Sequence, residues 1–218
     1  MEHQDVERLR DDLAAGKVTP DDIAVIANKY LEDNQYEQAY PIVSLLTETT
    51  GVANYTLMTA GLLALTLSRR EDAARFFERV VETDPMDFDA NYNLMLLDLD
   101  CGRTTAAEER LNRLLEANPE NACLYSDMAV LSANRSDYSK AMECWQKALS
   151  IDPNLSLARD NALEICLDKN LVTEGKHLLR FNASAPGVTS QSIREIETWA
   201  ERFARGTEVS RVTHLHAQ

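Results

Sequence analysis

The chain has 218 residues, of which 44% are hydrophobic, and its 36 acids against 22 bases give a formal net charge of −14. This charge argues against a nucleic-acid-binding protein, because phosphates are held by basic surface, and against attachment to an anionic bilayer. The sequence contains no run of eighteen apolar residues and no signal peptide, so we expect no direct membrane insertion and a cytoplasmic location.

The first predicted element is a leading helix within residues 1–19. Apolar residues recur at helical spacing from Val6 to Leu13, and Gly16 supplies a stop. Thr19 then has the character of an N-cap, so a second helix is predicted to begin directly after it.

From Pro20 onward the sequence repeats every 34 residues without insertion or deletion. The predicted units are 20–53, 54–87, 88–121, 122–155 and 156–187, an array of 20–187. Small residues recur at the eighth and twentieth positions, where two helices must touch, and large apolar residues recur at the twenty-fourth. Proline closes the second to fourth units and breaks the helix there. Each unit is therefore predicted to form two short amphipathic helices, which bury their apolar faces by stacking on neighbouring units.

This register resembles that of the tetratricopeptide repeat family. The residues that carry the resemblance are Gly61, Ala73, Phe77 and Pro85, echoed by Ala129, Ala141, Trp145 and Pro153. The terminal units depart from the pattern, since Gly51 replaces the proline of the first and Asn182 replaces an apolar residue of the fifth. The resemblance implies an all-α fold, a right-handed helix-turn-helix solenoid of about five repeats with terminal capping helices.

A capping helix is predicted in residues 188–206, after a linker-like stretch. Trp199 and Phe203 lie on its apolar face and are expected to cover the last repeat. The alternative is that these two residues form a detachable contact surface for a partner or for a second copy of the chain. Residues 207–218 are predicted to be a disordered tail, whose two histidines lack the further ligand that a metal site would need.

No catalytic signature, cofactor motif or metal-ligand spacing is found, so we expect a protein that is not an enzyme and has no cofactor. The four cysteines fall at different repeat positions and have no companion histidines. We therefore expect buried thiols, rather than metal ligands or disulfides, at Cys101, Cys123, Cys144 and Cys166.

In the family that the chain resembles, the first helix of each repeat lines a concave groove. The positions that usually face a ligand there hold no lysine or arginine in this chain. They hold eight acids, namely Asp21, Glu32, Asp89, Asp100, Asp127, Asp160, Glu164 and Asp168. The chain consequently lacks the bases with which some family members grip a chaperone's terminal carboxylate. The predicted partner-binding groove residues are Tyr55, Met58, Leu62, Asp89, Tyr92, Asn93, Leu96, Asp127 and Asn161. An alternative interpretation assigns several apolar groove positions to the core between repeats, namely Tyr55, Leu62, Leu65, Leu96 and Leu99.

The predicted function is a non-enzymatic interaction module: an adaptor, a chaperone or an assembly factor. Its partner would be a protein or peptide segment with apolar anchors and basic flanks, held in the acidic groove. The alternative is a self-assembling structural scaffold of stacked solenoids, and docking of the leading helix into a neighbour's groove would favour it. A homo-oligomer is possible on either interpretation. A plainer interpretation of the net charge is that it keeps the chain soluble.

Overall fold

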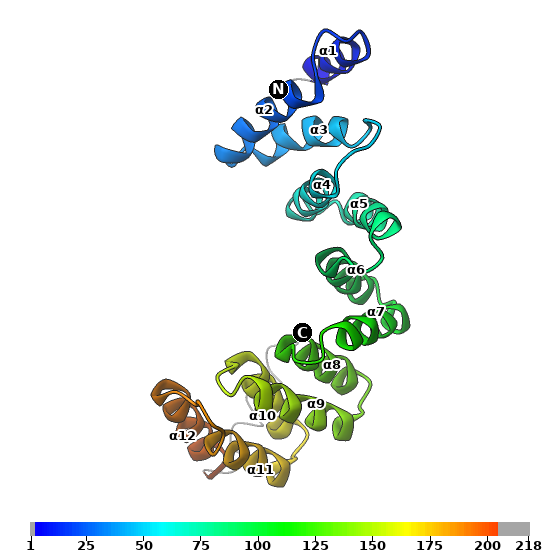
Figure 1. Ribbon diagram of the computed structural model, residues 1–218. Coiled ribbons are helices and arrows are strands. Elements are labelled where there is room, and N and C mark those ends of the chain that lie inside the picture. Colours follow the sequence, from blue (N-terminus) through cyan, green and yellow to red (C-terminus); the bar gives the residue numbers. More distant parts are fainter. Residues whose placement is uncertain (1–2, 205–218) are drawn as a thin grey trace. The chain divides into compact units, whose positions relative to one another are not determined.

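The computed structural model describes residues 3–204. Within this range the chain consists of helices and the turns between them, without a strand, which confirms the predicted all-α fold (Figure 1). Contacts divide the chain into two compact units, Met1–Ala107 (unit 1) and Glu108–Gln218 (unit 2). The sequence predicted a single array and gave no sign of this division, which falls inside a helix. No helix among the described residues is long and apolar enough to cross a membrane.

Unit 1 contains six helices and the first turn of a seventh. Their bounds are α1 His3–Ala14, α2 Pro20–Glu32, α3 Tyr36–Leu46, α4 Asn54–Thr66, α5 Arg70–Thr83, α6 Phe88–Asp100 and α7 Thr104–Ala117. From α2 to α6, each helix packs against the next one along the chain. The first helices of the repeats, α2 and α4, lie along one side of unit 1, and the second helices, α3 and α5, lie along the other (Figure 1).

The start of α2 has the predicted cap. The side chain of Thr19 accepts a hydrogen bond from the backbone N–H of Asp22, and the Asp22 carboxylate accepts one from the Thr19 N–H at 2.9 Å. These two bonds form a capping box. The Thr19 hydroxyl also donates to Asp22 Oδ2 at 2.7 Å, and this bond, followed by the one from the Thr19 N–H, holds the pKa of Asp22 below its ordinary value.

The eighth and twentieth repeat positions are buried throughout, as the register predicts. They are Ala27, Gly61, Met95, Ala129 and Leu163, followed by Ala39, Ala73, Ala107, Ala141 and Gly175. Asn182, which replaces an apolar residue in the fifth unit, is also fully buried. Its Nδ2 donates to the carbonyl oxygen of Pro153 at 2.9 Å, so a hydrogen bond holds this helix where an apolar contact holds the others.

A residue in the left-handed conformation stands at the fifteenth position of every repeat, between its two helices. The φ angles are 55° at Asn34, 59° at Ser68, 72° at Gly102, 64° at Ser136 and 56° at Asn170. Glycine and asparagine adopt this conformation readily, whereas other L-residues pay a steric penalty. The two serines are therefore local points of strain in otherwise regular repeats.

The leading helix α1 packs against α3 of its own unit. Val6 is only 6% exposed, and Leu9 and Leu13 pack against the unit 1 core. Arg10 Nη2 and Glu48 Oε1 form an ion pair at 2.9 Å between α1 and the turn that follows α3. The apolar side of α1 is thus used within its own chain.

Unit 2 contains the rest of α7 and five further helices. Their bounds are α8 Ala122–Asn134, α9 Tyr138–Ile151, α10 Ser156–Asp168, α11 Val172–Ala183 and α12 Ser190–Ala204. Consecutive helices from α8 to α12 pack on one another, and α12 also contacts α10. Trp145 of α9 is 1% exposed and is the largest of the fully buried side chains in this unit's core.

The last helix, α12, has the capping role that was predicted. Trp199 and Phe203 are buried in the unit 2 core. Trp199 Nε1 donates to Asp160 Oδ1 at 2.9 Å, and the fully buried Arg159 of α10 pairs with Glu195 of α12. These contacts favour a fixed cap over a detachable surface. Residues 205–218, which include the predicted tail, lie outside the described residues.

The expectation of four buried thiols is wrong for two of them. All four cysteines are free, but Cys101 and Cys123 are exposed, Cys144 is half-buried and Cys166 is buried. Cys101 follows the last residue of α6 and Cys123 lies in the first turn of α8, where a side chain can point to solvent. Helical spacing alone did not distinguish these positions from core positions.

Candidate partner-binding face

The helix α4 exposes one row of residues along its length, spaced i, i+4, i+7 and i+11. The row consists of Tyr55, Thr59, Leu62 and Thr66. Tyr55 is 72% exposed and Leu62 is 48% exposed. The hydroxyls of the two threonines donate to the carbonyl oxygens of Tyr55 at 2.8 Å and of Leu62 at 3.0 Å. This row therefore offers a partner apolar surface without a charge.

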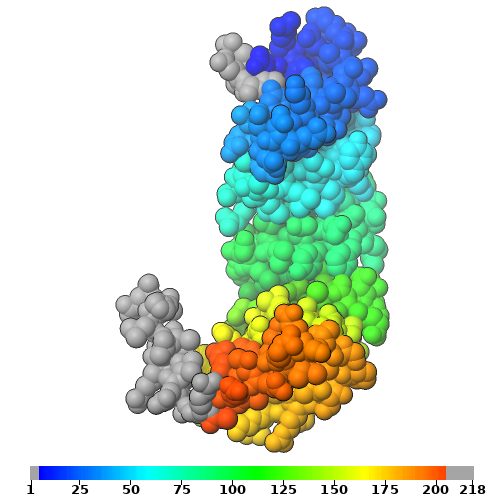
Figure 2. All heavy atoms as spheres, turned by 90° about the vertical axis from the view of Figure 1, so that its left-hand side faces the viewer, coloured from blue at the N-terminus to red at the C-terminus, as the bar shows by residue number. Residues whose placement is uncertain are grey.

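The flanking first helices present rows with the same spacing but with an acid at each end. On α2 the row is Asp21, Val25, Asn28 and Glu32, and on α6 it is Asp89, Asn93, Leu96 and Asp100. Val25 is 70% exposed and Leu96 is 41% exposed. The acids of each row are about 16.5 Å apart along the helix axis. We call these three rows the first-helix face; Figure 2 shows the side of unit 1 on which α2 and α4 lie.

The first-helix face carries a surplus of negative charge. Asp100 pairs with Arg70 of α5, with Oδ2 and Nε 3.3 Å apart. The other three acids of the face form no ion pair with any described residue. Lys29 is the only base in α2, α4 and α6. Acids that stand without partners at both ends of an apolar strip attract cationic groups and orient them on approach.

The structure distributes the predicted groove residues over several environments. Those that belong to the first-helix face are Tyr55, Leu62, Asp89, Asn93 and Leu96. Met58 is half-buried and packs against the unit 1 core, and Tyr92 is half-buried and stacks on Phe88 with ring centroids 5.9 Å apart. Asp127 and Asn161 are half-buried on α8 and α10 of unit 2.

The alternative interpretation, in which five apolar groove positions belong to the core between repeats, does not hold for all five residues. Tyr55, Leu62 and Leu96 are exposed, whereas Leu65 and Leu99 are half-buried. Leu65 packs against the unit 1 core. The sequence-based set also left out Val25, the most exposed apolar side chain of α2, although it occupies the same repeat position as Asn93.

In unit 2 one of the expected groove acids has a structural role. Asp160 accepts the indole N–H of Trp199 and lies 3.7 Å from Arg159 Nε, so it fastens the cap α12 to α10. Leu157 of α10 is 62% exposed, but the helix that bears it is partly covered by α12. Unit 2 therefore offers a weaker candidate than unit 1.

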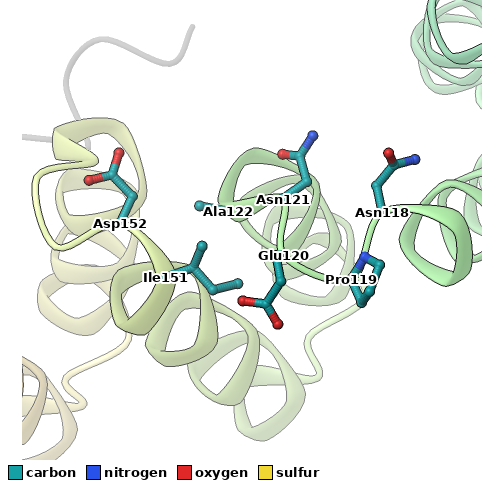
Figure 3. Close-up of a pocket in the computed structure, with 7 residues that line it drawn as sticks. All are labelled: Asn118, Pro119, Glu120, Asn121, Ala122, Ile151 and Asp152. Atoms are coloured by element: carbon teal, nitrogen blue, oxygen red, sulfur yellow. The ribbon is translucent and has the colours of Figure 1, made fainter.

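An open depression of about 490 Å³ lies in unit 2, where the turn before α8 meets the end of α9 (Figure 3). Its polar side chains include Asn118 and Asn121. Asn118 donates to the carbonyl oxygen of Leu114, and Asn121 accepts from the first N–H groups of α8. Both amides are therefore already hydrogen-bonded to backbone groups at the ends of helices. We interpret the depression as a feature of the turn and not as a ligand site. No group of three metal-ligating side chains occurs among the described residues.

Comparison with known proteins agrees with the geometry of the repeats. A family model described as tetratricopeptide repeat matches residues 64–129. Anaphase-promoting complex subunit 3 of Schizosaccharomyces pombe is 23% identical over 179 residues, which cover 80% of this chain and 26% of that protein. Tetratricopeptide repeat-containing protein trd-1 of Caenorhabditis elegans is 26% identical over 175 residues, covering 80% of this chain and 22% of that protein. This chain thus spans about a quarter of the length of these curated relatives.

Two solved structures illustrate the shared fold. The crystal structure of MamA superposes with a TM-score of 0.65 at 19% identity and covers 75% of this chain and 90% of MamA. The crystal structure of YrrB, described as a tetratricopeptide repeat protein with an unusual peptide-binding site, has a TM-score of 0.59 at 19% identity. It covers 71% of this chain and 82% of YrrB. At these identities the likeness concerns the fold.

Proposed function

Because the chain is a tetratricopeptide repeat protein, whose fold serves protein–protein interaction, we propose that the first-helix face of unit 1 binds an apolar segment of a partner protein flanked by lysine or arginine. The observation that carries the proposal is the uncharged row of α4, which stands between two rows with acids at their ends. The chain would act as an adaptor, chaperone or assembly factor through this contact.

The apolar side chains of the face supply the affinity in this proposal. Tyr55, Leu62 and Leu96 are exposed in the free chain, and covering each by a partner contributes about 1 to 2 kcal/mol, somewhat less than full burial of such a side chain. Asp21, Glu32 and Asp89 attract the basic flanks, which speeds association and fixes the direction of the segment. Binding should therefore weaken with salt, while its apolar part persists.

The relatives support a binding role without identifying the partner. The yeast relative is a subunit of a complex, and YrrB is described as having a peptide-binding site. Since the chain spans about a quarter of the yeast protein, the contacts of that whole protein are no guide to those of this chain.

Self-assembly through the ends of the chain is the alternative that the sequence left open. In the structure, α1 is docked on α3 of its own unit and α12 covers α10 and α11. Val6 at one end and Phe203 at the other are already buried. Because these apolar side chains are already covered within the described part of the chain, we do not favour this function.

Two synthetic peptides with the same apolar centre test the proposal, one flanked by lysines and the other by glutamates. We expect the lysine-flanked peptide to bind at least tenfold more tightly in fluorescence anisotropy, with the difference shrinking as salt is raised. The double variant Leu62→Arg, Leu96→Arg should bind it at least tenfold more weakly than the wild type.

Met86→Arg is the matched control, because Met86 is 67% exposed but lies in the turn between α5 and α6, outside the face. This variant should bind like the wild type. Equal affinity for both peptides, or equal loss in the control and the double variant, would remove the first-helix face as the binding site.

A further inference from the structure

Unit 1 has an open cavity of about 490 Å³ between α1, α3 and α5. Its walls come from these helices and from the turn that follows α3, so it lies outside the first-helix face, which belongs to α2, α4 and α6. The side chains of Val6, Pro41 and Phe76 give the cavity an apolar part. A cleft of this volume, with apolar walls and a few charged groups, is typical of a small-molecule site.

Three arginines line the cavity, and two of them are paired with acids that also line it. Arg10 pairs with Glu48 at 2.9 Å, and Arg75 pairs with Asp72. The Asp72 carboxylate also accepts the hydroxyl of Tyr40 at 2.8 Å. In both pairs the charge of the arginine is therefore neutralised within the unit.

The third arginine, Arg79, forms no ion pair with any described residue. Its Nη2 donates to the carbonyl oxygen of Thr47 at 2.8 Å, which fixes the guanidinium at the end of α3. This bond uses one of the five N–H groups of the guanidinium. Arg79 is half-buried, and a cation without a counter-ion is less favourable there than in open solvent. The cavity thus contains one positive charge that awaits an anionic partner.

A second polar group without a partner lies close to this contact. Ser44 lines the cavity three positions before Thr47 on α3, and residues at this helical spacing have Cβ atoms about 5 to 6 Å apart. The Ser44 Oγ is buried and has no hydrogen-bond partner among the described residues. A buried hydroxyl without a partner is unfavourable, and rotation about the Cα–Cβ bond turns it toward the cavity, where a ligand can accept its proton.

We propose that this cavity binds a small organic molecule with one carboxylate and an apolar body. The carboxylate pairs with the remaining N–H groups of Arg79, since a planar carboxylate can accept two guanidinium N–H groups at once, and it also accepts from Ser44. The apolar body lies against Val6 and Phe76. A monoanion fits better than a phosphate dianion, because Glu7 also lines the cavity without an ion pair to any described residue and repels additional negative charge.

N-acetyl-phenylalanine and its amide test the proposal, because they share one apolar body and differ in charge. Each is titrated into the full chain, together with inorganic phosphate as a third probe, and backbone amide shifts are followed by NMR. We expect the acid to bind saturably with shifts around Arg79 and in α1, and the amide and phosphate to bind at least tenfold more weakly. Equal binding of acid and amide, tighter binding of phosphate, or no saturable shift at the cavity would overturn the proposal.

A pair of variants that each remove one positive charge tests the role of Arg79. Arg79→Gln acts inside the cavity, whereas Arg8→Gln acts on α1 outside it, at a side chain that is 84% exposed. The acid should bind at least tenfold more weakly to Arg79→Gln and less than twofold more weakly to Arg8→Gln. An equal loss in both would show that the acid responds only to the net charge, against the proposal.

A second pair gives an effect of opposite sign and keeps the test valid even where Arg79→Gln unfolds the chain. Glu7→Gln removes the like charge from the cavity, and Glu78→Gln removes an acid from α5 outside it; both residues are exposed. The acid should bind Glu7→Gln about twofold to fivefold more tightly than the wild type and should bind Glu78→Gln like the wild type. Equal affinity for both variants would refute the site.

Discussion

The ring of Phe77 in α5 fills the space next to Gly61 in α4 that a side chain on the glycine would need. A Cβ on Gly61 would stand 2.7 Å from Phe77 Cζ, closer than real Cβ contacts, and Phe77 is fully buried and cannot swing aside. We expect Gly61→Ala to lower the free energy of unfolding by about 1 to 3 kcal/mol through overpacking. Urea denaturation of the variant and the wild type measures this difference.

A second substitution checks the cause. Phe77→Leu removes Cε1 and Cζ, the two ring atoms that would lie closest to the new Cβ, so adding it to Gly61→Ala should cost less than the two single changes together. Strict additivity would show that the alanine acts through something other than the ring of Phe77.

The fold was largely accessible from the sequence because the register places its small and large residues so regularly. Gly61, Phe77 and Asn182 were singled out by position alone, and all three are buried. The register could not show that Asn182 donates to Pro153, because that bond depends on a loop from a different helix pair. Nor could it reveal the division into two units, which depends on contacts across the whole chain.

The candidate site was predicted less completely than the fold. Helical spacing shows roughly which side of a helix a residue lies on, but an error of one position can exchange an exposed residue for a buried one. Tyr55 and Leu62 are exposed as expected, whereas Met58, three positions after Tyr55, packs against the core. Asp160 was expected on a groove and instead accepts the Trp199 indole. The 34-residue pattern cannot predict a hydrogen bond between two helices that are distant in the sequence.

Replacing the strained serines in the turns should stabilise the protein, whereas most substitutions destabilise it. Ser68 and Ser136 have φ angles of 59° and 64°, where glycine has no steric penalty. Each change to glycine should raise the free energy of unfolding by about 0.5 to 1 kcal/mol, after the greater flexibility of the unfolded chain is subtracted. Ser139→Gly, at an exposed position of α9, is the control and should destabilise. A loss of stability in both Ser68→Gly and Ser136→Gly would show that the left-handed conformation of these serines is not strained.

The exposed face and the core beneath it should respond differently to the same substitution. Leu62→Arg places a charge at an exposed position, so the free energy of unfolding should change by less than about 0.5 kcal/mol. Met58→Arg disturbs a side chain that packs against the unit 1 core and should cost about 1 to 2 kcal/mol. Thermal unfolding followed by circular dichroism compares the two. Similar losses would mean that Leu62 belongs to the core.

The four thiols should react at very different rates. Cys101 and Cys123 are exposed, whereas burial, with Glu174 nearby, raises the pKa of Cys166 to about 12. At pH 8 about one in ten thousand of the Cys166 thiols is therefore ionised, and only the thiolate reacts. A disulfide reagent should modify Cys101 and Cys123 first, and Cys166 only after unfolding in urea. Peptide mass spectrometry identifies the modified sites, and early labelling of Cys166 would contradict its burial.

The stability contributed by Asp72 of α5 should depend on pH. Tyr40 donates its hydroxyl to Asp72 Oδ2 at 2.8 Å, and Arg75 also pairs with this carboxylate. The Tyr40 hydrogen bond, followed by that of Arg75, holds the pKa of Asp72 below its ordinary value of 3.8. A carboxylate with a lowered folded-state pKa stabilises the fold above its unfolded pKa, and this contribution is lost as pH falls through the folded value.

Asp72→Asn should therefore lower the free energy of unfolding by about 1 kcal/mol at pH 7, and the gap to the wild type should narrow as pH falls below the ordinary carboxyl pKa of 3.8. Tyr40→Phe should reduce the same gap, because it removes the first cause of the shift. Urea titrations at pH 7, 5 and 3 measure the gap, with Glu71→Gln, an exposed carboxylate of the same helix, as the control. A gap that stays constant over this range would show that the effect of Asp72→Asn does not come from the ionised carboxylate.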